Sequence, residues 1–137
     1  MSDGFSVDFS GLDKLAADLG EVPKNIGPFV RKAVEVGARN VRDDWRQNAQ
    51  GMAHAPAFPY SITYDLKGGN AVRGSQIEAE IGPDKSRPQG ALGNLIEFGS
   101  VHNPPQGLGL GAVQREQEDF VEGLAKAEAD ARKKGDL

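Results

Sequence analysis

The sequence predicts a single α+β domain over residues 1–137, with a small antiparallel sheet packed on one long helix and a further helix at the C-terminus. Three observations support this fold class. The chain has 137 residues, which is an ordinary size for one domain. One stretch repeats apolar residues every three or four positions over about 22–25 residues, which is typical of a long helix. Two later segments alternate apolar and polar residues on either side of a Gly-Gly-Asn turn, which predicts a hairpin.

The first elements are expected to be a short strand and a helix. Residues 5–9 alternate Phe-Ser-Val-Asp-Phe, as in a strand with one buried face. Ser10 with Asp13 resembles a capping box, and Gly20 would end the helix that follows. The apolar face of this predicted helix is Leu12, Leu15, Ala16 and Leu19.

A long helix is expected to begin between Lys24 and Pro28, because proline is tolerated only in the first turn. At 1.5 Å per residue its length would be roughly 35 Å. Only one face is apolar, and charged residues occupy the remaining positions. The apolar face is Ile26, Val30, Ala33, Val34, Gly37, Ala38, Val41 and Trp45.

The rest of the chain predicts a hairpin, two further helices and three mobile loops. The loops are residues 50–60, 83–90 and 100–111, which are rich in glycine, proline or small polar residues. The hairpin pairs strands near residues 62–66 and 77–81 across a turn at 68–70, and Gly74 suggests a bulge. A short helix is expected from Ala91 to Phe98, and the last helix from about Val113 to Lys134. The apolar stripe of that last helix is Val113, Phe120, Val121, Leu124, Ala127 and Ala131.

The predicted order is therefore β-α-α-β-β-α-α. Because the stripe of the last helix is weak, with alanine at two of its six positions, we expect this helix to dock on a neighbouring subunit rather than on its own core.

Composition narrows the class of protein. The net charge of −4 argues against a dedicated DNA-binding domain. Leu, Ile, Val and Phe make up 31 of 137 residues, just above the roughly 20% below which chains tend to be disordered, so the core should be thin. The absence of cysteine excludes disulfides and cysteine-ligated zinc. No apolar run approaches the roughly 18 residues of a membrane span. The N-terminus lacks a signal-peptide pattern, so we expect a protein made and kept in a cytoplasm, or released by lysis.

No motif predicts an enzyme or a cofactor. His54 and His102 could share a metal with Asp84 or Glu97, but ligand-type spacing is absent and loop histidines are the simpler interpretation. The Gly-Leu-Gly-Leu-Gly stretch at 107–111 lacks the preceding strand and spacing of a dinucleotide loop, so a flexible linker is favoured. The remaining candidates are a Ser100–His102 pair, the adjacent Asp43 and Asp44, and Glu78 with Glu80; none is distinguishable from ordinary surface.

Glu97 stands out because apolar residues surround it. Its carboxylate would lie on the outer face of the short helix or pair with an arginine. A structural or interface salt bridge is favoured over catalysis. The long helix offers Arg31, Arg39, Arg42 and Arg46, of which Arg39 and Arg42, together with Trp45, are the expected neighbours of this segment.

Three stretches together resemble a bacteriophage family. They are Gly82-Pro83-Asp84-Lys85, Gly90-Ala91-Leu92-Gly93-Asn94-Leu95-Ile96-Glu97-Phe98-Gly99-Ser100, and Asn103-Pro104-Pro105. They are similar to the small neck, head–tail connector or tail-completion proteins of long-tailed phages. The likeness spans nearly the whole chain, and Leu-Ile-Glu-Phe-Gly-Ser is its most specific piece. One departure is the glycine-rich segment 106–114, where the family usually has an apolar, proline-containing one; this predicts a more mobile connection.

The resemblance implies a virion structural role in the neck, with no catalysis. The implied subunit would join heads to tails as part of a ring around the DNA channel, commonly six-fold, between head-closure and tail-terminator or tail-tube proteins. DNA would pass through without specific binding. The implied interface residues are Leu92, Leu95, Ile96, Glu97, Phe98, Gly99, Pro104 and Pro105. The alternatives are a tail terminator or head-closure protein of the same phage, and a non-viral cytoplasmic protein-binding module; an enzyme is the third.

Overall fold

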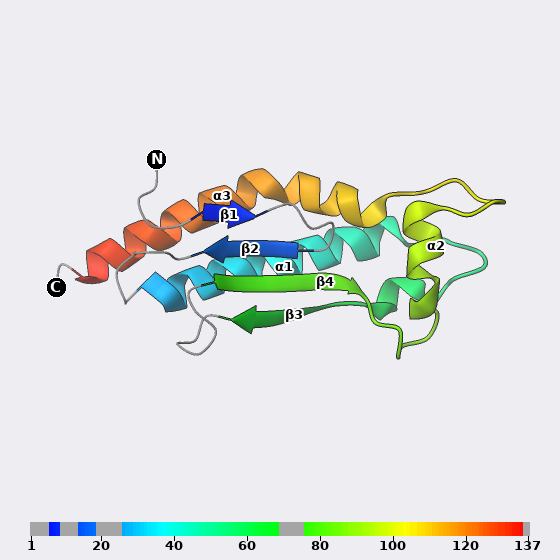
Figure 1. The fold of residues 1–137 in the computed structure, drawn as a ribbon, viewed down its shortest axis with the longest axis horizontal. Coiled ribbons are helices and arrows are strands. Elements are labelled where there is room, and N and C mark those ends of the chain that lie inside the picture. The colour runs from blue at the N-terminus through cyan, green and yellow to red at the C-terminus, as the bar shows by residue number, and fades with distance from the viewer. Residues whose placement is uncertain (1–5, 9–13, 19–25, 69–75, 136–137) are drawn as a thin grey trace.

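The computed structural model describes residues 6–8, 14–18, 26–68 and 76–135. Its architecture is α+β: one antiparallel sheet, two long helices against it, and a short helix at one end (Figure 1). The strands are β1 (Ser6–Asp8), β2 (Lys14–Asp18), β3 (Ile62–Gly68) and β4 (Gln76–Pro83). The helices are α1 (Gly27–Asn48), α2 (Gly93–Phe98) and α3 (Leu108–Gly135), with 3-10 turns η2 (Phe58–Ser61) and η3 (Gly90–Leu92).

The four strands lie in the order β1-β2-β4-β3, and all neighbours are antiparallel. The expected hairpin is confirmed as β3 and β4, whose register runs from Ile62 opposite Pro83 to Gly68 opposite Ile77. The predicted turn after Gly68 and the bulge at Gly74 fall on residues 69–75, outside the described part of the chain.

The helix expected after Ser10 is wrong where the structure describes it, because residues 14–18 form strand β2. β2 lies between β1 and β4, so its main chain pairs on both sides. Leu15 and Ala17 lie on the core face with no exposed surface, and Ala16 between them is buried as well. The helix-like spacing of Leu12, Leu15, Ala16 and Leu19 gave way to these tertiary pairings, and the order becomes β-β-α-β-β-α-α.

The long helix α1 is confirmed, and Pro28 stands in its first turn as expected. Two of its arginines tie it to edge strand β3. The Nη1 atom of Arg31 donates to the carbonyl of Gly68 at 3.3 Å, and Nε of Arg46 donates to the carbonyl of Ile62 at 2.9 Å. The helix therefore runs along the full length of β3, with its apolar face on the sheet.

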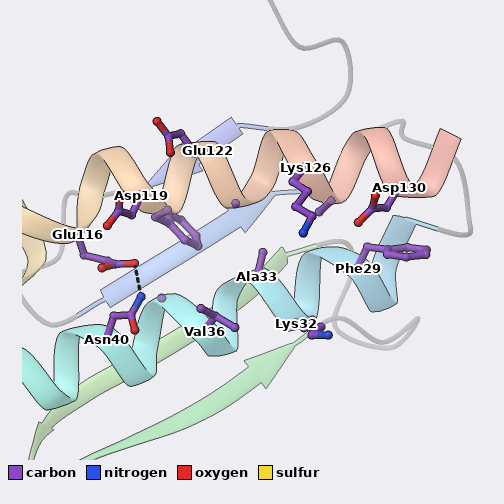
Figure 2. Close-up of a pocket in the computed structure, with 14 residues that line it drawn as sticks. Phe29, Lys32, Ala33, Val36, Asn40, Glu116, Asp119, Glu122, Lys126 and Asp130 are labelled. Atoms are coloured by element: carbon purple, nitrogen blue, oxygen red, sulfur yellow. Dashed lines mark hydrogen bonds between the residues drawn. The ribbon is translucent and has the colours of Figure 1, made fainter. Parts of the chain in front are cut away.

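The C-terminal helix differs from its prediction in two respects. It begins at Leu108, so the expected loop 100–111 ends earlier and its glycine-rich part is helical. It also packs on α1 of the same chain rather than waiting for a neighbouring subunit, with both helices side by side (Figure 2). Its stripe is buried as predicted except at Val121, which is 49% exposed.

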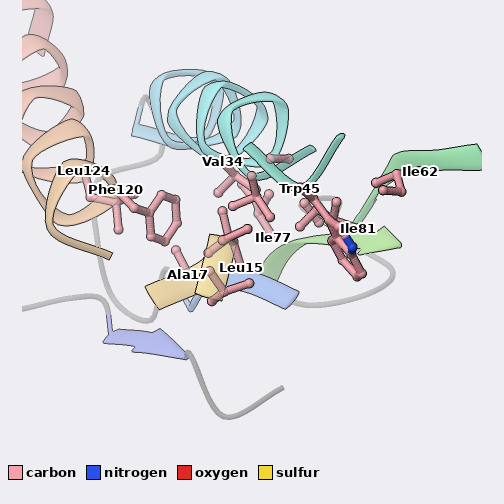
Figure 3. Close-up of a cluster of buried hydrophobic side chains, with 14 of the residues drawn as sticks. Leu15, Ala17, Val34, Trp45, Ile62, Ile77, Ile81, Phe120 and Leu124 are labelled. Atoms are coloured by element: carbon pink, nitrogen blue, oxygen red, sulfur yellow. The ribbon is translucent and has the colours of Figure 1, made fainter. Parts of the chain in front are cut away.

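The core lies where α1, α3 and the sheet meet (Figure 3). Gly37 lies where α1 packs closely on both β2 and α3: a Cβ there would lie 2.9 Å from side-chain carbons of both Leu15 and Phe120. A side chain at position 37 would therefore push β2 or α3 away from α1. The phenyl ring of Phe58, in the segment predicted as loop 50–60, is also in this core and is 1% exposed.

Candidate functional site

The residues that carry the phage resemblance gather at one end of the molecule, opposite the C-terminus (Figure 1). They form η3, α2 and the segment that leads into α3. Gly93 allows α2 to begin against the end of β4, because a Cβ there would lie 2.7 Å from the ring of Pro83. The expected short helix at 91–98 is thus confirmed, and the sheet fixes its position.

Glu97 anchors this end of the molecule. Its side chain is buried, at 6% exposure, and its two oxygens accept hydrogen bonds from main-chain N–H groups of α3. Oε1 lies 2.8 Å from the nitrogen of Gly109, and Oε2 lies 3.1 Å from that of Leu110. The first N–H groups of a helix have no intrahelical acceptor, and the helix dipole favours a negative charge beside them. Glu97 therefore caps α3 from twelve residues upstream.

The expected salt bridge of Glu97 with an arginine is wrong among the described residues. Both carboxylate oxygens are already taken by the helix terminus, which supplies the positive partner. Arg39 instead pairs with Glu35 at 3.7 Å, one helical turn away. Arg42 pairs with Asp43 at 2.9 Å, and its guanidinium lies 5.3 Å from the ring centre of Tyr64.

Trp45, the third expected neighbour, does lie beside this segment. Its indole ring packs on the first turn of α3, where a Cβ on Gly109 would lie only 2.5 Å from the ring. The glycine lets the helix approach the indole directly, and Gly109 is buried. The glycine-rich departure from the family pattern therefore begins a docked helix. The more mobile connection that we expected there is wrong for residues 108–111, which are helical.

Between α2 and α3 the chain makes a narrow excursion. Ser100 and Asn103 bond each other's main chains, with N–O distances of 2.8 and 3.3 Å. Gly99 has φ +81°, and a Cβ there would lie 2.7 Å from the nitrogen of Pro105, so only glycine fits. Beyond Pro105, the N–H of Gln106 donates to the carbonyl of Ile96 at 3.0 Å, which returns the chain to the end of α2.

This anchored segment exposes three large apolar side chains, which we call the α2 knob: Leu95, Phe98 and Val101. They are 53%, 62% and 95% exposed. Leu95 and Phe98 are three residues apart on α2 and therefore share a face. Val101 lies within the turn from Ser100 to Asn103. Exposed apolar side chains held on a fixed scaffold are typical of an interaction site.

The other residues singled out in the sequence lie apart from this end of the molecule or make local hydrogen bonds. No group of three or more His, Cys, Asp or Glu side chains there could hold a metal ion. The main-chain carbonyl of His54 accepts from Gln89 at 3.4 Å, and the carboxylate of Asp84 accepts from Ser86. Ser100 accepts from Asn103 at 3.4 Å.

The two carboxylate pairs are engaged in ion pairs. Asp43 pairs with Arg42, while Glu78 pairs with Lys14 and Glu80 with Lys67. Asp44 accepts two hydrogen bonds from the guanidinium of Arg115 on α3, at 2.6 and 2.8 Å. These bonds hold the pKa of the Asp44 carboxyl below its ordinary value. The pair fastens α3 to α1.

Sequence reasoning missed a second feature, an open groove between α1 and α3 with a volume of about 700 Å³. Glu116 lies in its wall and is 8% exposed. Burial raises the pKa of Glu116, while a hydrogen bond of 3.1 Å from Asn40 opposes this rise. The sequence signal for this feature was the set of small residues Ala33, Gly37 and Gly123, which are typical of closely packed helices. Only the structure shows that these residues of α1 and α3 line the same groove.

Comparison with protein-family models, with curated proteins and with solved structures found no match for this chain. No helix in the described residues has the length and apolar character to cross a membrane.

Proposed function

We propose that this chain is a structural subunit of the phage neck, which acts in tail completion and head–tail joining as part of a ring around the DNA channel. Its partners would be other copies of itself and the adjacent head-closure and tail-terminator or tail-tube proteins.

 The ring would have six-fold symmetry, as is common in phage necks. The chain would be located in the virion, after assembly in the host cytoplasm.

One observation carries this proposal: some residues of the phage-like segment are buried and fix it to the rest of the protein, whereas others are exposed to solvent. Glu97 is buried and caps α3, and Ile96 is partly buried against the core. Phe98, Pro104 and Pro105 are exposed. A segment that only stabilised the fold would bury its large apolar side chains, whereas an interface segment exposes them from a fixed base.

The charge of the chain is compatible with a channel wall. A net charge of −4 gives little attraction for the phosphate backbone, so DNA could slide past without being held. The chain would contribute shape and contacts between subunits, and binding of DNA would have no part in its role.

The test is complementation of a phage that lacks this gene. Phe98→Asp places a charge on the α2 knob without disturbing the core, because Phe98 is 62% exposed. Loss of a hot-spot contact of about 2–3 kcal/mol weakens one interface roughly 30–150-fold. We expect unjoined heads and tails in electron micrographs, and a fall in infectious titre of at least this order.

Val121→Asp is the matched control, since Val121 is an exposed apolar residue of α3 outside the knob and is 49% exposed. It should complement as the wild type does. If phage complemented with Phe98→Asp join heads to tails normally, the α2 knob is not an interface in head–tail joining. Normal joining by phage that lack the gene altogether would overturn the proposed function.

A further inference from the structure

The proposed function does not use the groove between α1 and α3. It is open along the helix pair (Figure 2). We call it the α1–α3 groove. Along α1 it extends from Phe29 to Asn40, which is about 16 Å at 1.5 Å per residue. Its apolar lining is Phe29, Ala33, Val36, Gly37, Phe120 and Ala127.

One side-chain contact between the two helices lies at each end of the groove. At one end Asn40 donates to Glu116 across the two helices at 3.1 Å. At the other, the ammonium group of Lys134 lies 5.9 Å from the ring centre of Phe29. Between them Val36 is 41% exposed, an unusual exposure for an aliphatic residue on a helix that faces another helix.

The rim of the groove is acidic. Its lining includes four carboxylates, Glu116, Asp119, Glu122 and Asp130, against two ammonium groups, those of Lys32 and Lys126. An apolar occupant flanked by positive charge would match both the lining and the rim.

The end of the molecule that carries the α2 knob has those properties. The turn that precedes η3 carries exposed Lys85 and Arg87, with one opposing carboxylate, that of Asp84, 3.8 Å from Arg87. Arg87 reaches the carbonyl of Tyr60, whose ring is 62% exposed. This end of the molecule is therefore apolar and mildly basic. The six residues of α2 span about 9 Å, which fits within the length of the groove.

We propose that the α2 knob of one subunit docks in the α1–α3 groove of a second copy of this chain. Figure 1 shows α2 at one end of the molecule, beyond the sheet, whereas the parts of α1 and α3 that line the groove lie toward the other end. A contact between two different surfaces is heterologous, so each subunit that docks leaves a free knob and a free groove. Repetition closes a ring when the rotation permits. This inference rests on the proposed function, because it names the contact that would build the ring.

The first experiment mixes two single variants and measures mass by native mass spectrometry. Phe98→Asp disables the knob and Val36→Asp disables the groove, and both sites are exposed enough to keep the fold. We expect a wild-type oligomer and two monomeric variants. An equimolar mixture should give a heterodimer, because one intact knob then meets one intact groove. Val121→Asp should assemble as the wild type does.

The second experiment uses the absence of cysteine in the natural chain, which leaves engineered thiols as the only ones present. A Val36→Cys and Val101→Cys double variant, oxidised with copper phenanthroline, should give a ladder of linked chains on a denaturing gel. Each single-cysteine variant should give dimers at most.

The outcomes separate this contact from the proposed function. If Val36→Asp assembles normally while Phe98→Asp does not, the knob docks elsewhere and the inference is wrong, although the neck role stands. A wild-type chain that stays monomeric and gives no ladder also overturns the inference. Only the phage complementation decides the neck role itself.

Discussion

Removal of the Glu97 carboxylate should destabilise the protein by detaching the start of α3. Glu97→Ala leaves two N–H groups without their acceptors, those of Gly109 and Leu110. Gly109 is buried, so its N–H cannot recover a bond to water, whereas Leu110 is 46% exposed. An unsatisfied buried donor costs about 1–3 kcal/mol, and loss of a helix cap typically costs about 1 kcal/mol.

We therefore expect Glu97→Ala to lower the free energy of unfolding by about 2–3 kcal/mol. Glu97→Gln keeps one acceptor oxygen but loses the charge beside the helix dipole. It also turns an amide NH₂ toward an N–H group. Its cost should be smaller, about 1–2 kcal/mol.

Urea unfolding followed by circular dichroism measures both values. Hydrogen exchange should locate the effect, with protection lost first at the amides of Gly109 and Leu110. Glu118→Ala is the matched control, because Glu118 is an exposed carboxylate of the same helix; its effect should stay within about 0.5 kcal/mol. If Glu97→Ala proves as mild as this control, the carboxylate does not hold the helix and the reasoning fails.

The remaining predictions concern the packing and charges of α3. Gly109→Ala should destabilise the protein by about 1–3 kcal/mol despite the high helix propensity of alanine, because its Cβ would lie 2.5 Å from the indole ring of Trp45. Gly123→Ala should stabilise the protein by about 0.5–1 kcal/mol, because the nearest atom to its Cβ would be 3.9 Å away. Thermal unfolding of the two variants compares these effects. Glu116→Gln should stabilise the protein at pH 7, because burial raises the folded-state pKa of Glu116 above its ordinary 4.5 and penalises the charged form. The gain in stability should disappear well below pH 4.5, where the carboxyl is protonated in both the folded and the unfolded state. An equal gain at all pH values would contradict this cause. A double-mutant cycle of Asp44→Asn and Arg115→Ala should give a coupling of about 0.5–1 kcal/mol at neutral pH. Because the folded-state pKa of Asp44 is below its ordinary 3.8, that coupling should be lost as the pH falls below this value, and a coupling unchanged in acid would show that the charge is irrelevant.

The elements that the sequence predicted correctly are those with a long or regular pattern. The helix Gly27–Asn48 has a buried stripe over 22 residues, and the strands of the hairpin alternate on both sides of a glycine turn. These patterns are local, because each can be recognised without knowledge of what packs against it. The resemblance to the phage family and the neck role that it implies both stay predictions.

The errors have a common cause in long-range contacts. The segment Lys14–Asp18 has a helix-like spacing of apolar residues, but it forms a strand because its main chain pairs with β1 on one side and β4 on the other. Residues 108–111 have low helix propensity because of three glycines in the stretch 107–111, but a carboxylate twelve residues upstream caps them.

Local patterns in the amino-acid sequence were enough to predict the α+β class, the long amphipathic helix, the hairpin and Glu97 as an unusual carboxylate. They did not predict what that carboxylate binds, that α3 packs on its own chain, or that a groove lies between the two long helices. The reason is the distance along the chain over which each feature is encoded. Helix and strand periodicity depends on neighbouring residues. The cap by Glu97, the contact of Gly109 with the indole ring of Trp45 and the α1–α3 groove each require two segments that are distant in the sequence to meet.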